Sequence, residues 1–130
     1  MSDTKESSEK LVRDFLGAWE GRNLETICSA FADNAVYHNV PVKPIEGMAG
    51  IRAIFQAFLD GFKEARLEIV TLASGPGLVI AERIDYFTMN NGGKIVLPVT
   101  GVFVVKNNKI TRFSDYFDLA DFERQSGMKL

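Results

Sequence analysis

Residues 78–89 read LVIAERIDYFTM, a pattern typical of a β-strand. Successive side chains of a strand point to opposite faces, so this stretch presents two sets of residues. One set is Val79, Ala81, Arg83, Asp85 and Phe87, and the other is Leu78, Ile80, Glu82, Ile84 and Tyr86. Both sets are largely apolar, which predicts a strand covered on both faces. The charged pair Arg83 and Asp85 near its middle is therefore unexpected.

The same period of two continues on either side of this strand. It predicts further strands at 65–74, 94–105 and 110–118, joined by turns at 75–77, 90–93 and 107–108. The part of the chain before residue 65 instead follows a helical period. It predicts helices at 8–21, 23–31 and 47–62, one short strand at 35–40, and a flexible tail at 1–7. A short helical segment at 119–125 closes the chain.

Helices followed by hairpin-linked strands predict an α+β fold. We expect a strongly curved, mostly antiparallel sheet with the N-terminal helices packed over it, which forms a cone with an internal apolar pocket. The 130 residues correspond to one domain, and no repeat or long linker indicates a second. A fold of this kind does not by itself fix a function.

Composition excludes several classes of partner. The net charge is −2 and the Lys and Arg residues are scattered, so neither nucleic acid nor an anionic membrane is expected to bind. No apolar run is long enough to span a bilayer. Cys28 is the one cysteine, and the polar N-terminus lacks the apolar core of a signal peptide, so we expect a cytoplasmic protein. Ten phenylalanines fit a core or an apolar cavity.

The last predicted strand also carries an acid among apolar residues, because Asp115 lies between Phe113 and Phe117 on one face. Tyr37 and Asn39 share a face of the first predicted strand. We expect these polar residues to meet at the bottom of the cone: Arg83, Asp85, Asp115, Tyr37 and Asn39. An arginine between two carboxylates can satisfy both through its planar set of donors. A purely structural bridge between two strands would use the same arrangement, and the spacing alone does not separate the two.

These segments resemble the limonene-1,2-epoxide hydrolase family. Residues 81–85 (AERID) are similar to its Glu-Arg-Val-Asp strand, residues 115–119 (DYFDL) to its closing strand, and residues 37–41 (YHNVP) to its Tyr-x-Asn-x-Pro segment. Residues 101–103 (GVF) match a family tripeptide. The resemblance covers nearly the whole chain after the tail. It departs at Phe113, where tryptophan is common, in a shorter polar tail and in a slightly shorter loop near residues 90–93.

The resemblance implies an enzyme that adds water to a lipophilic, cyclic epoxide in one step and gives a vicinal diol. Asp115 would be the general base for a water molecule held by Tyr37 and Asn39. Asp85 would protonate the ring oxygen, and Arg83 would bridge the two aspartates. The family also implies a homodimer and needs no cofactor or metal ion.

The pocket wall is expected to be apolar, and its candidate residues are Phe58, Phe62, Phe87, Leu97, Val99, Phe117 and Phe122. An ordinary core explains each of these positions equally well. Two other functions stay open. One is an isomerase or cyclase of the same cone, which belongs to a broader superfamily that includes nuclear transport factor 2-like, polyketide-cyclase-like and ketosteroid-isomerase-like proteins. The other is a non-catalytic binder of a lipophilic ligand.

Overall fold

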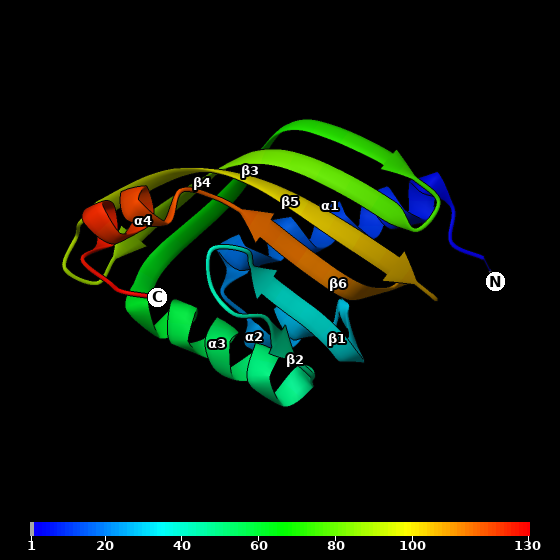
Figure 1. Ribbon diagram of the computed structural model, residues 1–130, viewed down its shortest axis with the longest axis horizontal. Helices are drawn as coiled ribbons and strands as arrows, with labels where there is room; N and C mark the ends of the chain where they lie inside the picture. The colour runs from blue at the N-terminus through cyan, green and yellow to red at the C-terminus, as the bar shows by residue number, and fades with distance from the viewer. Residues whose placement is uncertain (1) are drawn as a thin grey trace.

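The computed structural model describes residues 2–130, which form one six-stranded sheet with four helices (Figure 1). The helices are α1 (Lys5–Gly21), α2 (Leu24–Cys28), α3 (Met48–Gly61) and α4 (Leu119–Ser126). The strands are β1 (Phe31–Asn39), β2 (Ile45–Glu46), β3 (Phe62–Gly75), β4 (Leu78–Met89), β5 (Lys94–Lys106) and β6 (Lys109–Tyr116). The predicted α+β class is confirmed.

The sheet has the order β2-β1-β6-β5-β4-β3 and is antiparallel except between β1 and β6. It curves strongly, and α1, α2 and α3 lie on its concave side, whereas α4 lies at one end beside β5 (Figure 1). This arrangement is the expected cone. The β5–β6 turn is closed by Asn107 and Asn108, both with positive φ, as expected of a tight asparagine-rich hairpin.

Helix α1 begins at Lys5, earlier than the predicted residue 8. The Thr4 hydroxyl accepts a hydrogen bond from the Ser7 backbone N–H, and the Ser7 hydroxyl accepts one from the Thr4 N–H. This reciprocal capping box satisfies two donors that the first turn would otherwise leave free. The Asp3 carboxylate also accepts the N–H groups of the β5–β6 turn. Residues 5–7, predicted to be part of a flexible tail, are therefore helical.

Two aromatic residues predicted in helices belong to strands. Phe31 begins β1 and pairs with Ile110 of β6, so α2 ends three residues earlier than predicted. Phe62 begins β3, pairs with Met89, and stacks on Phe87 at 4.6 Å between ring centroids. Their tertiary packing outweighs the local helical pattern. The two-residue strand β2 was not predicted.

The core is built from aromatic rings that α1 presses against the sheet. Phe15 of α1 lies 5.1 Å from Phe31 and 5.5 Å from Phe113, and Phe103 stacks on Phe113 at 4.4 Å. A second, smaller apolar cluster lies at the α4 end of the sheet and comprises Phe62, Ile95, Leu97, Val99 and Phe122. The space between the two clusters is where the polar residues meet.

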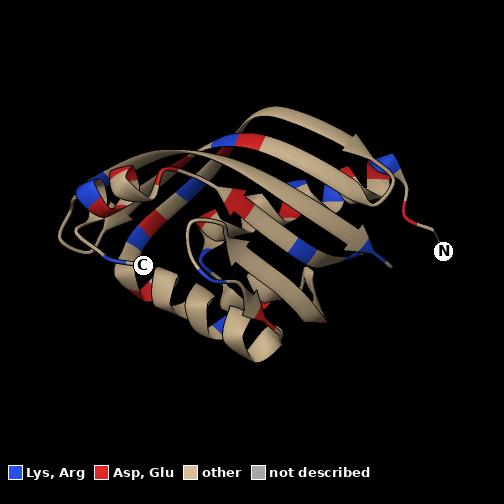
Figure 2. Cartoon of the chain, viewed as in Figure 1, with Lys and Arg blue, Asp and Glu red and all other residues tan. Residues whose placement is uncertain are grey.

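The convex face of the sheet is partly apolar. Its large exposed side chains include Leu78 and Ile80 of β4, Val96 of β5 and Tyr116 of β6. Acidic and basic residues are interspersed along the elements rather than gathered by sign (Figure 2). Within residues 2–130, no helix has the length and apolar character that crossing a membrane requires.

Candidate active site

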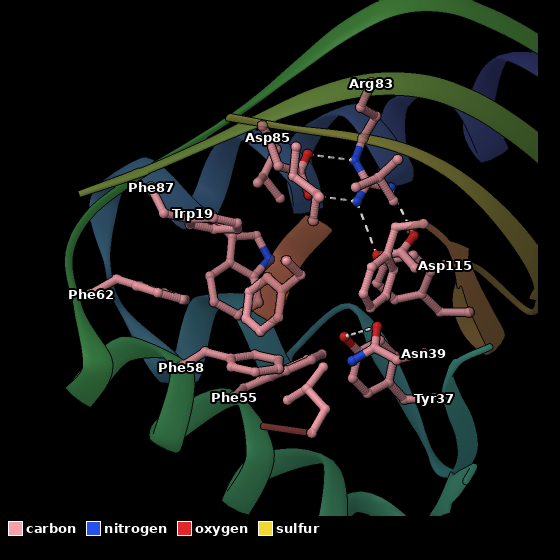
Figure 3. A pocket seen from close by; sticks show the side chains of 17 residues that line it. Trp19, Tyr37, Asn39, Phe55, Phe58, Phe62, Arg83, Asp85, Phe87 and Asp115 are labelled. Atoms are coloured by element: carbon pink, nitrogen blue, oxygen red, sulfur yellow. Dashed lines mark hydrogen bonds and ion pairs between the residues drawn. The ribbon is translucent and has the colours of Figure 1, made fainter. Parts of the chain in front are cut away.

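Arg83 is the centre of a buried ion cluster that joins two strands, β4 and β6. Its side chain is 1% exposed and lies between Asp85 on the same strand and Asp115 on β6 (Figure 3). The guanidinium donates to Asp85 from Nε at 3.0 Å and from Nη2 at 2.9 Å. It donates to Asp115 from Nη1 and from Nη2, both at 2.9 Å. Both carboxylates are therefore held in the two-pronged geometry that suits a guanidinium.

The bridge passes over β5, and Gly101 makes room for it. In the register of the sheet Gly101 pairs with Asp115 on one side and with Ala81 on the other. A Cβ atom at this position would stand 2.5 Å from Arg83 Nη1 and 2.7 Å from Asp115 Oδ1. A side chain on residue 101 would therefore require the ends of the Arg83 and Asp115 side chains to shift.

The cluster of Arg83, Asp85 and Asp115 is electrically neutral only when one of its two carboxyl groups is protonated. Arg83 contributes one positive charge, and its pKa is raised above the usual value because the two carboxylates outweigh the opposing effect of burial. With both aspartates ionised, one negative charge would remain uncompensated in an apolar setting, which is unfavourable. Burial raises the pKa of Asp85; Arg83 opposes the rise, and the charge of Asp115 adds to it. These effects favour a protonated Asp85.

Tyr37 and Asn39 form a polar pair beside Asp115. The Tyr37 hydroxyl donates to Asn39 Oδ1 at 2.8 Å, and Asn39 pairs with Asp115 in the parallel β1–β6 register. Burial raises the pKa of Tyr37, and the charge of Asp115 adds a smaller rise. The phenol therefore stays protonated. The Asn39 carboxamide is fixed by this bond, and its NH₂ group remains to donate elsewhere.

All twelve site residues predicted from the sequence line one pocket. These are the five polar residues Arg83, Asp85, Asp115, Tyr37 and Asn39 and the seven apolar ones Phe58, Phe62, Phe87, Leu97, Val99, Phe117 and Phe122. Sequence reasoning missed five further lining residues, namely Trp19, Phe55, Leu67, Phe113 and Leu130. Trp19 and Phe55 lie on apolar helix faces, where the sequence carries no signal that separates a pocket wall from a core.

The arrangement offers acid–base chemistry inside an apolar wall. It places the carboxyl groups of Asp85 and Asp115 on one guanidinium, next to the Tyr37 phenol and the Asn39 carboxamide. Within the part of the chain that the structure describes, no group of three or more His, Cys, Asp or Glu side chains could hold a metal ion. Cys28 is buried in α2, where burial raises the pKa of its thiol, and it does not line this pocket.

Comparison with known proteins identifies related chains. A family model described as the limonene-1,2-epoxide hydrolase catalytic domain matches residues 6–127. Epoxide hydrolase EphG of Mycobacterium tuberculosis is 28% identical over 110 residues, which cover 85% of this chain and 72% of that protein.

Solved structures share the fold. An M. tuberculosis epoxide hydrolase described as LEH-like matches with a TM-score of 0.82 and 24% identity, over 94% of this chain and 90% of that one. A putative polyketide cyclase from Xanthomonas campestris matches with a TM-score of 0.86 and 19% identity, over 94% of this chain and 98% of that one. These likenesses show the cone fold, which both activities share. The family match, which covers nearly the whole chain, is more specific: this protein belongs to the limonene-1,2-epoxide hydrolase family.

Proposed function

We propose that this protein is an epoxide hydrolase that converts a lipophilic, cyclic epoxide to a vicinal diol by direct addition of water. The observation that carries the proposal is the Asp85–Arg83–Asp115 bridge, in which two carboxyl groups share one guanidinium at the wall of an apolar pocket. Opening an epoxide with water needs a base for the water and an acid for the departing oxygen. A bridge that holds one proton provides both.

Asp115 acts as the general base. It takes a proton from a water molecule that Tyr37 and Asn39 hold beside it, and the water oxygen attacks one epoxide carbon. The Asn39 NH₂ group donates to this oxygen, while the carboxylate accepts the proton. The fixed Tyr37–Asn39 bond supports this role because it orients the carboxamide before the substrate enters.

Asp85 acts as the general acid. As the bond between carbon and ring oxygen breaks, Asp85 gives its proton to that oxygen, and the diol forms with no covalent intermediate. The cluster has gained a proton at Asp115 and lost one at Asp85, so its total charge is unchanged. Arg83 makes two hydrogen bonds to each carboxylate. It therefore stabilises the cluster without moving, whether the proton is on Asp85 or on Asp115.

The pocket wall favours an apolar substrate. Aromatic rings from α3, β3, β4 and α4 surround the cluster, including Phe58, Phe62, Phe87 and Phe122. Such a wall binds hydrocarbon and excludes bulk water that would compete with the positioned molecule. An isomerase or cyclase of the same cone would need only one carboxylate base and would leave the double bridge to Arg83 without a chemical task.

We further propose that the protein is a cytoplasmic homodimer made of one such domain per chain. The convex face of the sheet supports the dimer, because it exposes Ile80 and Tyr116 between charges of opposite sign, Glu82 of β4 and Arg112 of β6. A twofold axis through this face would bring Glu82 of one copy toward Arg112 of the other. Such an interface uses the same patch on both subunits.

Asp115→Asn tests the role of the base. We expect the variant to form diol from cyclohexene oxide or limonene oxide about a thousandfold more slowly, the scale of a lost general base. The fold should survive, because ionised Asp85 and Arg83 would still form a neutral pair. Mass spectrometry of the diol gives the rate, and circular dichroism checks the fold.

The matched control for this variant is Asp33→Asn, the same chemical change on an exposed part of β1. It should turn over epoxide at the wild-type rate. Diol formation that is equally fast in Asp115→Asn and Asp33→Asn would contradict the assignment of the base. No diol from any cyclic epoxide, with a folded wild type, would favour an isomerase, a cyclase or a ligand binder.

Direct attack by water predicts where heavy oxygen goes. In a single turnover in H₂¹⁸O with enzyme in excess, the label should appear in the diol and not in the peptide that contains Asp115. Attack by the Asp115 carboxylate itself would instead form an ester and leave the label on the enzyme after hydrolysis. Mass spectrometry of the diol and of that peptide separates the two routes.

The raised pKa of Asp85 predicts how stability depends on pH. The unfolded chain releases this proton near the ordinary value of 3.8, whereas the folded protein keeps it to higher pH. Above pH 3.8 the folded state therefore binds more protons, so rising pH favours unfolding until Asp85 ionises in the folded state. Relative to Asp85→Asn, the wild type should lose up to about 1.4 kcal/mol of unfolding free energy per pH unit over this interval. Urea unfolding at a series of pH values measures the difference, and parallel curves would contradict it.

The proposed dimer predicts a mass of twice 14.4 kDa in solution. Ile80→Lys should convert it to a monomer, because a charge in the centre of an apolar interface is poorly tolerated. Light scattering after size-exclusion chromatography measures both masses. Ala53→Lys, on an exposed part of α3, is the control and should leave the mass at that of the wild type. A wild-type mass of one chain would refute the dimer.

A further inference from the structure

Trp19 brings a polar atom to the part of the pocket wall that is otherwise apolar. It is the one tryptophan of the chain, lies in α1 and is 6% exposed. Figure 3 shows its indole ring on the same side of the pocket as Phe58, Phe62 and Phe87, with the ring nitrogen turned toward the interior. Of the six polar side chains that line the pocket, the other five form the ion cluster and the Tyr37–Asn39 pair.

The indole N–H has no acceptor within the described residues 2–130. Among residues 2–130, no hydrogen bond involves Trp19 Nε1, although a buried indole N–H ordinarily finds a partner. The same residues contain no fully buried side-chain nitrogen or oxygen that lacks a partner, so the Trp19 nitrogen keeps surface open to the pocket. An indole N–H can only donate, and whatever satisfies it must carry an acceptor atom.

The packing of Trp19 limits the distance between its ring and Tyr37, which lies beside the ion cluster. The Trp19 ring packs edge-on against Phe55 at 5.1 Å between centroids, and Tyr37 packs against Phe55 at the same 5.1 Å. The ring centroids of Trp19 and Tyr37 are therefore separated by at most twice this distance. A substituted six-membered ring has about that length. A molecule whose epoxide sits beside Asp85 and Asp115 would bring its far end to the indole.

We infer that Trp19 is a specificity-determining residue, whose N–H donates to an oxygen acceptor at the end of the substrate remote from the epoxide. The inference rests on the proposed function and narrows the substrate class to lipophilic cyclic epoxides that carry a second oxygen, as a carbonyl, ether or hydroxyl group. A pure hydrocarbon epoxide still fits the wall, but it leaves the N–H without a partner inside the pocket, which weakens its binding.

Binding is tested first on the wild type, without turnover. Because Trp19 is the one tryptophan, a ¹H–¹⁵N spectrum contains a single indole signal. Acetylcyclohexane and isopropenylcyclohexane are a matched pair of probes, since a carbonyl oxygen in the first replaces a methylene carbon in the second. The indole proton should move downfield with the ketone and not with the hydrocarbon. The same movement with both probes, or none with the ketone at saturation, would overturn the inference.

Kinetics give the second test, with 4-acetylcyclohexene oxide and its 4-isopropenyl analogue as substrates. The ratio of their kcat/KM values should fall about tenfold in Trp19→Phe, which keeps an aromatic ring and removes the donor. Phe58→Leu changes the same wall without removing a donor and should keep the wild-type ratio. Because the ratio compares two substrates on one enzyme, a loss of stability alone does not move it.

The two tests separate this inference from the proposed function. Diol formation with an unchanged ratio and an unresponsive indole signal would refute the role of Trp19 and leave the hydrolase intact. An indole signal that responds only to the ketone, with no epoxide opened, would refute the hydrolase and establish the pocket as a binding site for an oxygenated lipophilic molecule.

Discussion

Burying the Arg83 guanidinium imposes the strictest requirement in this molecule. A lone charge in an aromatic interior is strongly unfavourable, so its neighbours must supply acceptors in the right number and geometry. Asp85 supplies two oxygens from the same strand and Asp115 two from β6. The register of β4, β5 and β6 must then be fixed, because a slip of one residue would turn one aspartate to the outer face of the sheet. The hairpins and the aromatic layer under α1 maintain that register.

The same requirement also bears on the charge of the cluster and on the groups that gather around it. Two carboxylates and one guanidinium carry one net negative charge, so a proton on one carboxyl would make the cluster neutral, and burial acts in that direction by raising the pKa of Asp85. The parallel pairing of β1 with β6 adds Asn39 beside Asp115. Polar groups from β1, β4 and β6 thus converge on one point, although they are far apart in the sequence.

Much of the fold and of the candidate site could be predicted from the sequence. The alternation of inward and outward residues along the strands made inward-facing charges visible. Arg83, Asp85 and Asp115 stood out because charges rarely face inward, and the resemblance to a known family supplied their roles. Helical segments were less informative, since the inward face of α1 packs on the core at Phe15 and on the pocket at Trp19 without any change of pattern. Element ends were misjudged where tertiary contacts decide them, as at Phe31 and Phe62, and where Ser7 replaces the usual acidic partner of a capping box.

Gly101 leaves room for the charged bridge because it has no side chain. A β-carbon there would lie too close to the ends of the Arg83 and Asp115 side chains, which would have to shift to admit it. Arg83 on β4 can therefore reach Asp115 on β6 across the strand between them, and a single methyl group on that strand would be enough to alter the distance between the two charges.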